Sequence, residues 1–322
     1  MKLPLIKTLN TMNLKHFILQ YGLYASFLIV FLVFTLTSPS FLMPANIVNV
    51  VEQAAYYMIC AIGATFVIIS GSNDLSIGSV LAFSSVVSAM VMLSTGNIVL
   101  GCFVAIGVSL ACGIINGMSV IKIGMPAFVA TIALGNVVRG YAYYLTKAVT
   151  IRGLPSKFTR YSWGSFAGIP NLILVALLFF CVAYYVLRHT SYGRKLYAVG
   201  GNPVASKIMG INADRIKISA YIISGLCAGI GAILMASRMG SARSATAESL
   251  HLECIAAAVI GGTNMKGGEG SLIGTIVGAM LISMIRNGLN LVGLSYFYQL
   301  VVTGSIILIA SILDSLKHRI SN

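Results

Sequence analysis

Residues 98–121 read IVLGCFVAIGVSLACGIINGMSVI, an uninterrupted run that contains no charged side chain. A transmembrane α-helix needs about 20 predominantly apolar residues to cross the hydrocarbon core of a bilayer, and this run is long enough. Similar runs recur along the chain. Hydrophobic residues make up 58% of the 322 residues and charged residues 9%, whereas soluble domains carry roughly 25% charged residues. The sequence therefore predicts an all-α polytopic membrane protein.

The apolar runs predict about ten membrane spans, with eight or nine as alternatives. They are expected at about 17–37, 47–69, 78–94, 98–121, 125–146, 168–187, 218–237, 250–262, 271–290 and 294–313. The third is weakly defined. The run at 250–262 is too short to cross alone, so it is expected to be a half-helix or to pair with a loop. We expect a single transmembrane domain over residues 1–322, with no separate soluble domain.

The charge distribution predicts the orientation of these spans. The chain carries 21 Lys and Arg residues and a net charge of +14. Basic residues gather on the cytoplasmic side of membrane proteins, which explains the charge better than nucleic-acid binding does. Ten spans with both termini in the cytoplasm put most of these basic residues inside. The longest cytoplasmic loop is then 188–217.

Small residues at helical spacing indicate close helix packing. Glycines four residues apart occur as Gly113/Gly117, Gly225/Gly229 and Gly270/Gly274/Gly278. This spacing lets helix backbones approach closely in lipid. We expect contacts within the subunit, with a contact between subunits as the alternative. The six cysteines are scattered through apolar runs without C-x-x-C spacing, which indicates buried thiols rather than disulfides or a metal site.

The stretch GGNPVASKIMGI at 200–211 predicts a short helix outside the bilayer with both ends specified. Asn202 is a good N-cap, and Pro203 suits the first helical position because it needs no N–H donor there. Gly210 is placed to end the helix in the left-handed conformation. One face of this helix would be apolar and would consist of Val204, Ala205, Ile208 and Met209.

Ionisable and polar groups within the spans, or between two of them, are candidates for a transport path or gate. These candidates are Asp74, Asn136, Asn287 and Asn290. Asp74 has an alternative role as an N-cap carboxylate at the start of the next span. Arg139 and Arg286 lie near the predicted outer ends of their spans, where snorkelling to the interface would explain them without a function.

The predicted outer loop 147–168 is basic and has no acidic residue, against the positive-inside trend. A solvated loop is one explanation, and a docking surface for an acidic partner is the other. The docking candidates are Arg152, Lys157, Arg160 and Arg243.

No enzyme motif accompanies these features. The sequence has neither G-x-x-x-x-G-K-[ST] nor H-E-x-x-H, so it lacks the usual phosphate-binding loop and zinc-protease helix. We expect no catalytic residue, no metal site and no cofactor bound by this chain. A weak internal similarity links IISGSNDLSIGS (68–79) to VIGGTNMKGGEGS (259–271). Duplicated halves are common in transporters, but two short stretches do not establish a repeat.

Several stretches resemble the permease subunits of ATP-binding-cassette importers for ribose, galactose, xylose and arabinose, with autoinducer importer permeases close by. SGSNDLSIGSVLA (70–82) is similar to the family's G-x-D-L-S-x-G-S element, although Asn73 departs from the usual Ile. Further similar segments are MPAFVATIALGNVVRGYAYYLT (125–146), TSYGRKLYAVGGNPVASKIMGIN (190–212), IAAAVIGGTNMKGGEGSLIGTIVGAMLI (255–282) and NGLNLVGLSYFYQ (287–299).

The resemblance implies a permease that forms the path for a simple sugar or a similar small polar solute across the bacterial inner membrane. Its partners would be membrane lipid, a second permease (identical or different), a periplasmic binding protein and a cassette ATPase that binds the ATP and is often fused in tandem. The helix from Asn202 would be the coupling helix to the ATPase, the alternative being a helix lying on the membrane surface. The basic outer loop would receive the binding protein. An ion-coupled secondary carrier is the alternative function.

Overall fold

A computed structural model describes residues 23, 25–295, 297–302, 304–305 and 308. In this part of the chain, six helices are long and apolar enough to cross a membrane. They are α2 (Pro44–Ile69), α3 (Ile77–Thr95), α4 (Ile98–Ile121), α7 (Asn171–His189), α10 (Ala213–Met239) and α12 (Leu272–Leu291). The chain is therefore a multi-pass helical membrane protein.

Among the described residues, two further helices pack against these six. Helix α5 (Ala127–Thr146) packs beside α3 and α4, and α11 (Leu250–Ile260) packs against α12 and α2. Helix α11 has 11 residues, which confirms that this segment is too short to cross a bilayer alone. The first predicted span is described as a helix over Ala25–Thr37. The span predicted at 294–313 and both termini lie largely outside the described residues, so the count of ten spans and the cytoplasmic termini stay predictions.

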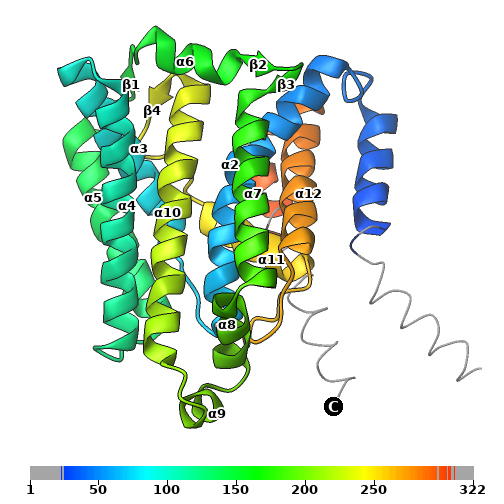
Figure 1. Ribbon diagram of the computed structural model, residues 1–322. Helices are drawn as coiled ribbons and strands as arrows, with labels where there is room; N and C mark the ends of the chain where they lie inside the picture. Colours follow the sequence, from blue (N-terminus) through cyan, green and yellow to red (C-terminus); the bar gives the residue numbers. More distant parts are fainter. Residues whose placement is uncertain (1–22, 24, 296, 303, 306–307, 309–322) are drawn as a thin grey trace, which may run out of the picture.

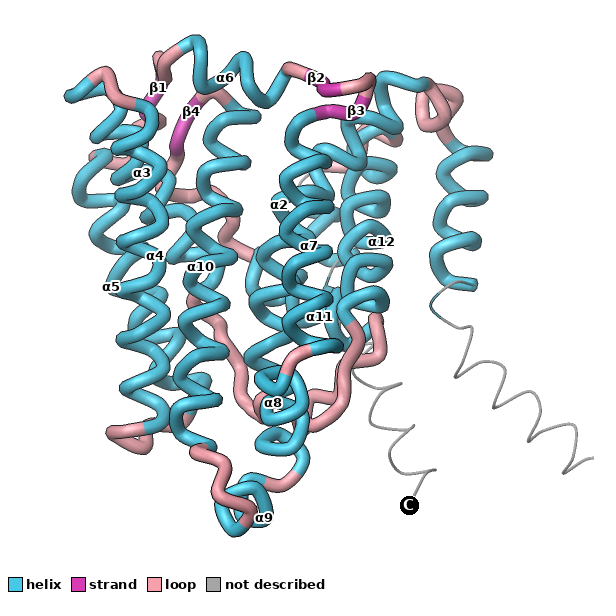
Figure 2. Tube along the Cα trace, viewed as in Figure 1, coloured by secondary structure: helices cyan, strands magenta, loops and turns pink. Residues whose placement is uncertain are grey.

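Short elements lie at the two ends of the bundle (Figure 1). At one end, strand β1 (Ile151–Arg152) pairs antiparallel with β4 (Ser241–Ala242). Helix α6 (Ser156–Trp163) and the small hairpin of β2 (Ser165–Phe166) and β3 (Ile169–Pro170) lie at this same end (Figure 2). At the opposite end lie α8 (Ser191–Gly201) and α9 (Pro203–Ile208). We call these the β1 end and the α9 end.

Helices α4 and α10 pack through the glycines that the sequence singled out. A Cβ atom on Gly225 would lie 2.4 Å from the carbonyl oxygen of Ser109, and one on Gly113 would lie 2.6 Å from that of Tyr221. Both distances are too short for any side chain, so the backbones touch directly. Gly278 of α12 approaches α11 in the same way. The predicted packing role within the subunit is therefore confirmed.

The main core surrounds α2 and α10, which contact each other along the centre of the bundle. Its fully buried side chains include Tyr221, Phe66 and Leu81. Of the cysteines, Cys60, Cys112, Cys227 and Cys254 are buried. Cys102 is half-buried and Cys181 is exposed, so the predicted burial holds for the thiols that face the bundle interior.

Candidate functional site

Helix α9 forms as its sequence predicts. The Asn202 side-chain oxygen accepts a hydrogen bond of 2.9 Å from the Ala205 N–H, and Pro203 is the first helical residue. Gly210 follows with φ +78°, a conformation that glycine adopts without strain. The next helix, α10, is capped likewise, because the Asn212 side chain accepts from the Arg215 N–H at 3.0 Å. These caps fix the local conformation on both sides of α9.

The apolar face of α9 points away from the bundle. Val204, Ile208 and Met209 are 68%, 83% and 67% exposed, and Ala205 is half-buried. Charged groups flank this face, since Asp214 accepts from Lys122 at 3.3 Å and lies 4.0 Å from Lys207. Clustered apolar residues with a polar surround are typical of a contact surface.

Asp74 lies in the loop between α2 and α3 and is almost fully buried. One carboxylate oxygen accepts from the N–H and the hydroxyl of Ser76, at 2.9 and 2.6 Å. The other accepts from the Ser224 hydroxyl of α10 at 2.7 Å, and Asn116 of α4 donates to the Ser76 hydroxyl at 2.8 Å. The N-cap residue of α3 is Ser76, so Asp74 stands just before the helix and ties this loop to α10 and α4.

The asparagines predicted as path candidates do not form one polar stripe. Asn287 of α12 is buried and exchanges two amide hydrogen bonds with Asn46, at 3.0 and 2.9 Å. Asn290 accepts from Gln299 at 2.7 Å and is exposed. Asn136 is exposed on α5, on the other side of the bundle from α12 (Figure 1). The path role of these residues stays a prediction.

Arg139 does not snorkel, contrary to the sequence interpretation. It reaches from α5 to the turn segment that links β4 to α11, where it donates to the carbonyl oxygens of Ser244 and Thr246, both at 2.6 Å. It also donates to the Ser79 hydroxyl at 3.3 Å. Buried backbone carbonyls need internal partners. Arg139 therefore stabilises a non-helical segment that leads into the half-helix α11.

Arg286 is likewise held inside the bundle rather than at the interface. It forms an ion pair of 2.5 Å with the buried Glu253 of α11 and also bonds the Tyr57 hydroxyl of α2. Ser249 donates to the same Glu253 oxygen at 2.6 Å. The sequence analysis did not predict this ion pair. It could have been predicted from an arginine and a glutamate in neighbouring apolar runs, because buried ionisable groups in membranes usually pair with one another.

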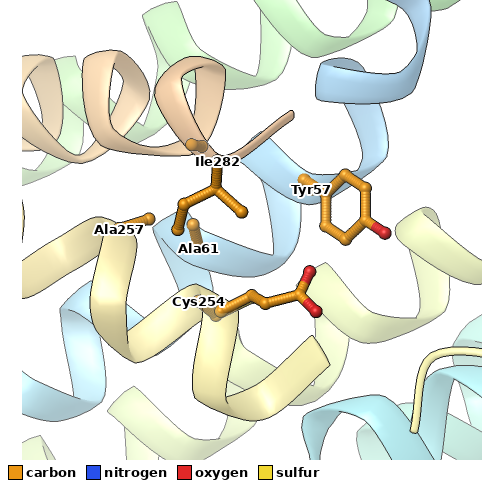
Figure 3. Close-up of a pocket in the computed structure, with 7 residues that line it drawn as sticks. Tyr57, Ala61, Cys254, Ala257 and Ile282 are labelled. Atoms are coloured by element: carbon orange, nitrogen blue, oxygen red, sulfur yellow. The ribbon is translucent and has the colours of Figure 1, made fainter. Parts of the chain in front are cut away.

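Two cavities lie against these helices. The first has a volume of about 10 Å³, enough for about one water molecule. Tyr57, Ala61, Cys254 and Ile282 line it together with Glu253 (Figure 3). The second, of about 580 Å³, is a groove between α2, α7 and α12. Its lining is apolar and includes Ala55, Met58, Ile173, Leu177, Phe180 and Ile276. Neither matches a sugar, because the first is too small and the second offers few polar partners.

The basic residues of the predicted docking loop share the β1 end. The β1–β4 pairing sets Arg152 opposite Ser241, and Arg243 directly follows β4. Lys157 and Arg160 lie on α6, and all four basic residues are exposed. Buried Phe158 anchors α6, and its carbonyl accepts from the Ser237 hydroxyl of α10 at 2.6 Å. The surface is therefore basic, and α6 is fixed against α10 by burial of Phe158 and by this hydrogen bond.

Comparison with known proteins identifies the family. Residues 46–311 match the family described as branched-chain amino acid transport system / permease component. The chain belongs to this permease family. It is 39% identical over 300 residues to the ribose import permease protein RbsC of Bacillus subtilis (strain 168), with 92% of this chain and 93% of that protein covered.

Two further relatives match along nearly their whole length. The permease is 34% identical over 303 residues to the ribose import permease protein RbsC of Escherichia coli (strain K12), covering 93% of this chain and 94% of the relative. It is 31% identical over 297 residues to the L-arabinose ABC transporter permease protein AraH of Azospirillum brasilense, covering 92% of this chain and 88% of that protein.

These matches establish the class of function. The permease is a transport subunit of the ATP-binding-cassette importer type and not an enzyme, because ATP hydrolysis in such systems belongs to a separate subunit. They favour this reading over an ion-coupled secondary carrier. A permease of this type works with an ATPase and a substrate-binding protein.

Proposed function

We propose that this permease forms the translocation path for a simple sugar, or a similar small polar solute, in the bacterial inner membrane. The observation that carries the proposal is the match, along nearly the whole chain, to permeases named for ribose and arabinose import. The proposed topology is one domain of about ten spans with both termini in the cytoplasm. The α9 end then faces the cytoplasm, in keeping with its basic residues.

Helix α9 is proposed as the coupling helix to the ATPase. Its exposed side chains Val204, Ile208 and Met209 would enter a groove of that partner, and its caps at Asn202 and Gly210 would keep it rigid. A rigid helix passes on a displacement that a flexible loop would absorb. The ATPase would bind the ATP, and this chain would hold no cofactor.

The sugar path is proposed to form between two permeases. Support comes from the cavities of the single subunit, since the small one beside Glu253 holds about one water molecule and the large one is apolar. A ligand site for a sugar needs several convergent polar groups in a cavity of about 300 Å³ or more. The partner permease would complete it. The basic surface of Arg152, Lys157, Arg160 and Arg243 is proposed to receive the binding protein outside the cell.

Reconstitution tests this proposal. The permease, its ATPase and its binding protein are placed in proteoliposomes, and uptake of labelled ribose, arabinose and leucine is measured with and without ATP. We expect ATP-dependent uptake of a sugar and none of leucine. Uptake of leucine alone would overturn the sugar assignment. Uptake driven by an ion gradient, without the ATPase, would overturn the importer mechanism.

A further inference from the structure

Three segments from distant parts of the chain meet at the α9 end through glycine backbones. Gly71 follows the end of α2, with φ +77°. Gly200 lies in the last turn of α8. Gly267 and Gly268 lie in the loop between α11 and α12, with φ +89° and +78°. We call Gly71, Gly200, Gly267 and Gly268 the glycine junction.

The backbones of the glycine junction are in direct contact. A Cβ atom on Gly200 would lie 1.8 Å from the carbonyl oxygen of Ile69 and 2.6 Å from the nitrogen of Gly268. One on Gly267 would lie 2.6 Å from the Cα of Gly71. Because real Cβ atoms do not approach other atoms this closely, no side chain fits between the three segments. Tightly packed contacts of this kind have low compressibility and transmit strain.

Hydrogen bonds hold the same three segments together. The Gly268 N–H donates to the Ile69 carbonyl at 2.9 Å, which joins the α11–α12 loop to the end of α2. The Tyr197 hydroxyl of α8 donates to the Gly270 carbonyl at 2.8 Å. Burial raises the pKa of Tyr197 above its ordinary value, although Arg188 opposes this shift. The hydroxyl therefore remains a donor at physiological pH.

Each segment of the junction leads to a different functional part. Asn202, the cap of α9, follows α8 directly. Asp74 comes three residues after Gly71 and is bonded to α10. The α11–α12 loop connects the two helices that carry the Glu253–Arg286 ion pair. The two stretches with similar sequences, 68–79 and 259–271, thus meet at the segment that carries α9.

We propose that the glycine junction transmits a displacement of α9 to the α2–α3 and α11–α12 loops together, and so links the ATPase contact to the membrane interior. This inference rests on the proposed coupling function of α9. Its glycines are positioning residues, because they touch neither the ATPase nor the solute. A packed contact has discrete arrangements rather than a soft continuum, so a push on α8 would move both loops as one unit.

Two adjacent glycines give a matched test. Gly200→Ala adds a methyl group 1.8 Å from the Ile69 carbonyl oxygen, whereas Gly201→Ala adds one whose nearest neighbour, the Gly268 Cα, is 3.8 Å away. Both residues lie at the end of α8, so they share local helix propensity. Tyr197→Phe is a third variant that removes only the hydrogen bond to Gly270.

Four readings are needed on each reconstituted complex: permease abundance in the membrane, co-purification of the ATPase, basal ATP hydrolysis, and hydrolysis stimulated by the sugar-loaded binding protein. Coupling between two sites corresponds to about 5- to 150-fold. We therefore expect the stimulated-to-basal ratio of Gly200→Ala to fall at least about fivefold while the ATPase still co-purifies. Gly201→Ala should retain the wild-type ratio, and Tyr197→Phe should lower it.

A wild-type ratio in both Gly200→Ala and Tyr197→Phe would overturn the inference. If Gly200→Ala fails to accumulate, Tyr197→Phe decides alone, because loss of one hydroxyl leaves the packing intact. A variant in the α9 apolar face separates this outcome from failure of the proposed function. If Met209→Asp impairs the complex and the junction variants do not, α9 contacts the ATPase but the junction does not carry the signal.

Discussion

Arg139 of α5 donates a 2.6 Å hydrogen bond to the carbonyl oxygen of Ser244, across 105 positions of the sequence. The same guanidinium group serves the carbonyls of Thr246 and Ala247. Arginine suits this role because its planar group presents several donors in a fixed geometry. One side chain thus supplies hydrogen-bond donors to three backbone carbonyls of the turn that leads into α11.

Replacing this arginine is expected to destabilise the permease. Arg139→Gln leaves carbonyls without their donors, at a cost of about 1–3 kcal/mol for each unsatisfied group. Arg139→Lys should recover only part of this lost stability, because an ammonium group lacks the planar, multi-donor geometry of the guanidinium group. The midpoint of thermal unfolding of the detergent-purified permease is the measurement. Arg160→Gln, at an exposed position on α6, should leave the midpoint unchanged. A wild-type midpoint for Arg139→Gln would contradict this role.

The Glu253–Arg286 ion pair gives a second prediction. Removing one partner leaves a buried charge without compensation, which typically costs about 3–5 kcal/mol. Glu253→Gln and Arg286→Gln should each lower the unfolding midpoint strongly. The double variant should be more stable than the sum of the single losses implies, with a coupling of about 0.5–3 kcal/mol. Additive losses in this double-mutant cycle would show that the two side chains act independently.

Six of the ten expected spans were predictable because a membrane demands long apolar runs. The apolar run at 98–121 coincides with α4, Ile98–Ile121. The short length of the run at 250–262 predicted the half-helix α11. Helices α6 and α8 were not predicted as helices. Both lie in loops with mixed polar composition, where the apolar length that marks a span is absent. Their helicity depends on packing, as Phe158 and Leu196 are buried against the bundle.

The local structure of α9 was also predictable, because caps act within a few residues. Asn202, Pro203 and Gly210 specify the ends of that helix without help from the remaining chain. The contacts of Arg139 and Asn287 were not predictable in this way. Their partners, Ser244 and Asn46, lie more than a hundred residues away in sequence. Only the packed bundle brings such groups together.

The basic surface at the β1 end predicts a salt-dependent contact. Exposed ion pairs contribute about 0.2–1 kcal/mol each, so reversing several together should weaken docking of the binding protein by about tenfold or more at low salt. The fourfold variant for this test carries Arg152→Glu, Lys157→Glu, Arg160→Glu and Arg243→Glu. The difference should shrink at high ionic strength because salt screens exposed charges.

Arg194→Glu provides the control for this docking experiment. Arg194 is also exposed, but it lies on α8, at the opposite end of the bundle. Its reversal should not change the affinity for the binding protein. The measurement is a dissociation constant for permease complexes in nanodiscs at two salt concentrations. Equal affinities of the fourfold variant and the wild type at low salt would count against docking at this surface.

The apolar face of α9 predicts a loss of ATPase contact when it is charged. Met209→Asp places a carboxylate on a residue that is 67% exposed, so the fold of the permease should tolerate it. A charge buried without a partner in an interface is strongly unfavourable, so the ATPase should no longer co-purify, or sugar-stimulated ATP hydrolysis should be lost. Membrane abundance should stay at the wild-type level.

Val149→Asp is the matched control for this variant. Val149 is 66% exposed and follows α5, next to β1 at the opposite end of the bundle. Both variants place an aspartate at an apolar position of nearly equal exposure, but on opposite ends of the bundle. Val149→Asp should retain co-purification of the ATPase, because a substitution at the far end leaves the α9 face intact. If Met209→Asp also retains both co-purification and stimulated hydrolysis, α9 is not the coupling helix, and the exposed loop around Lys266 becomes the segment to test.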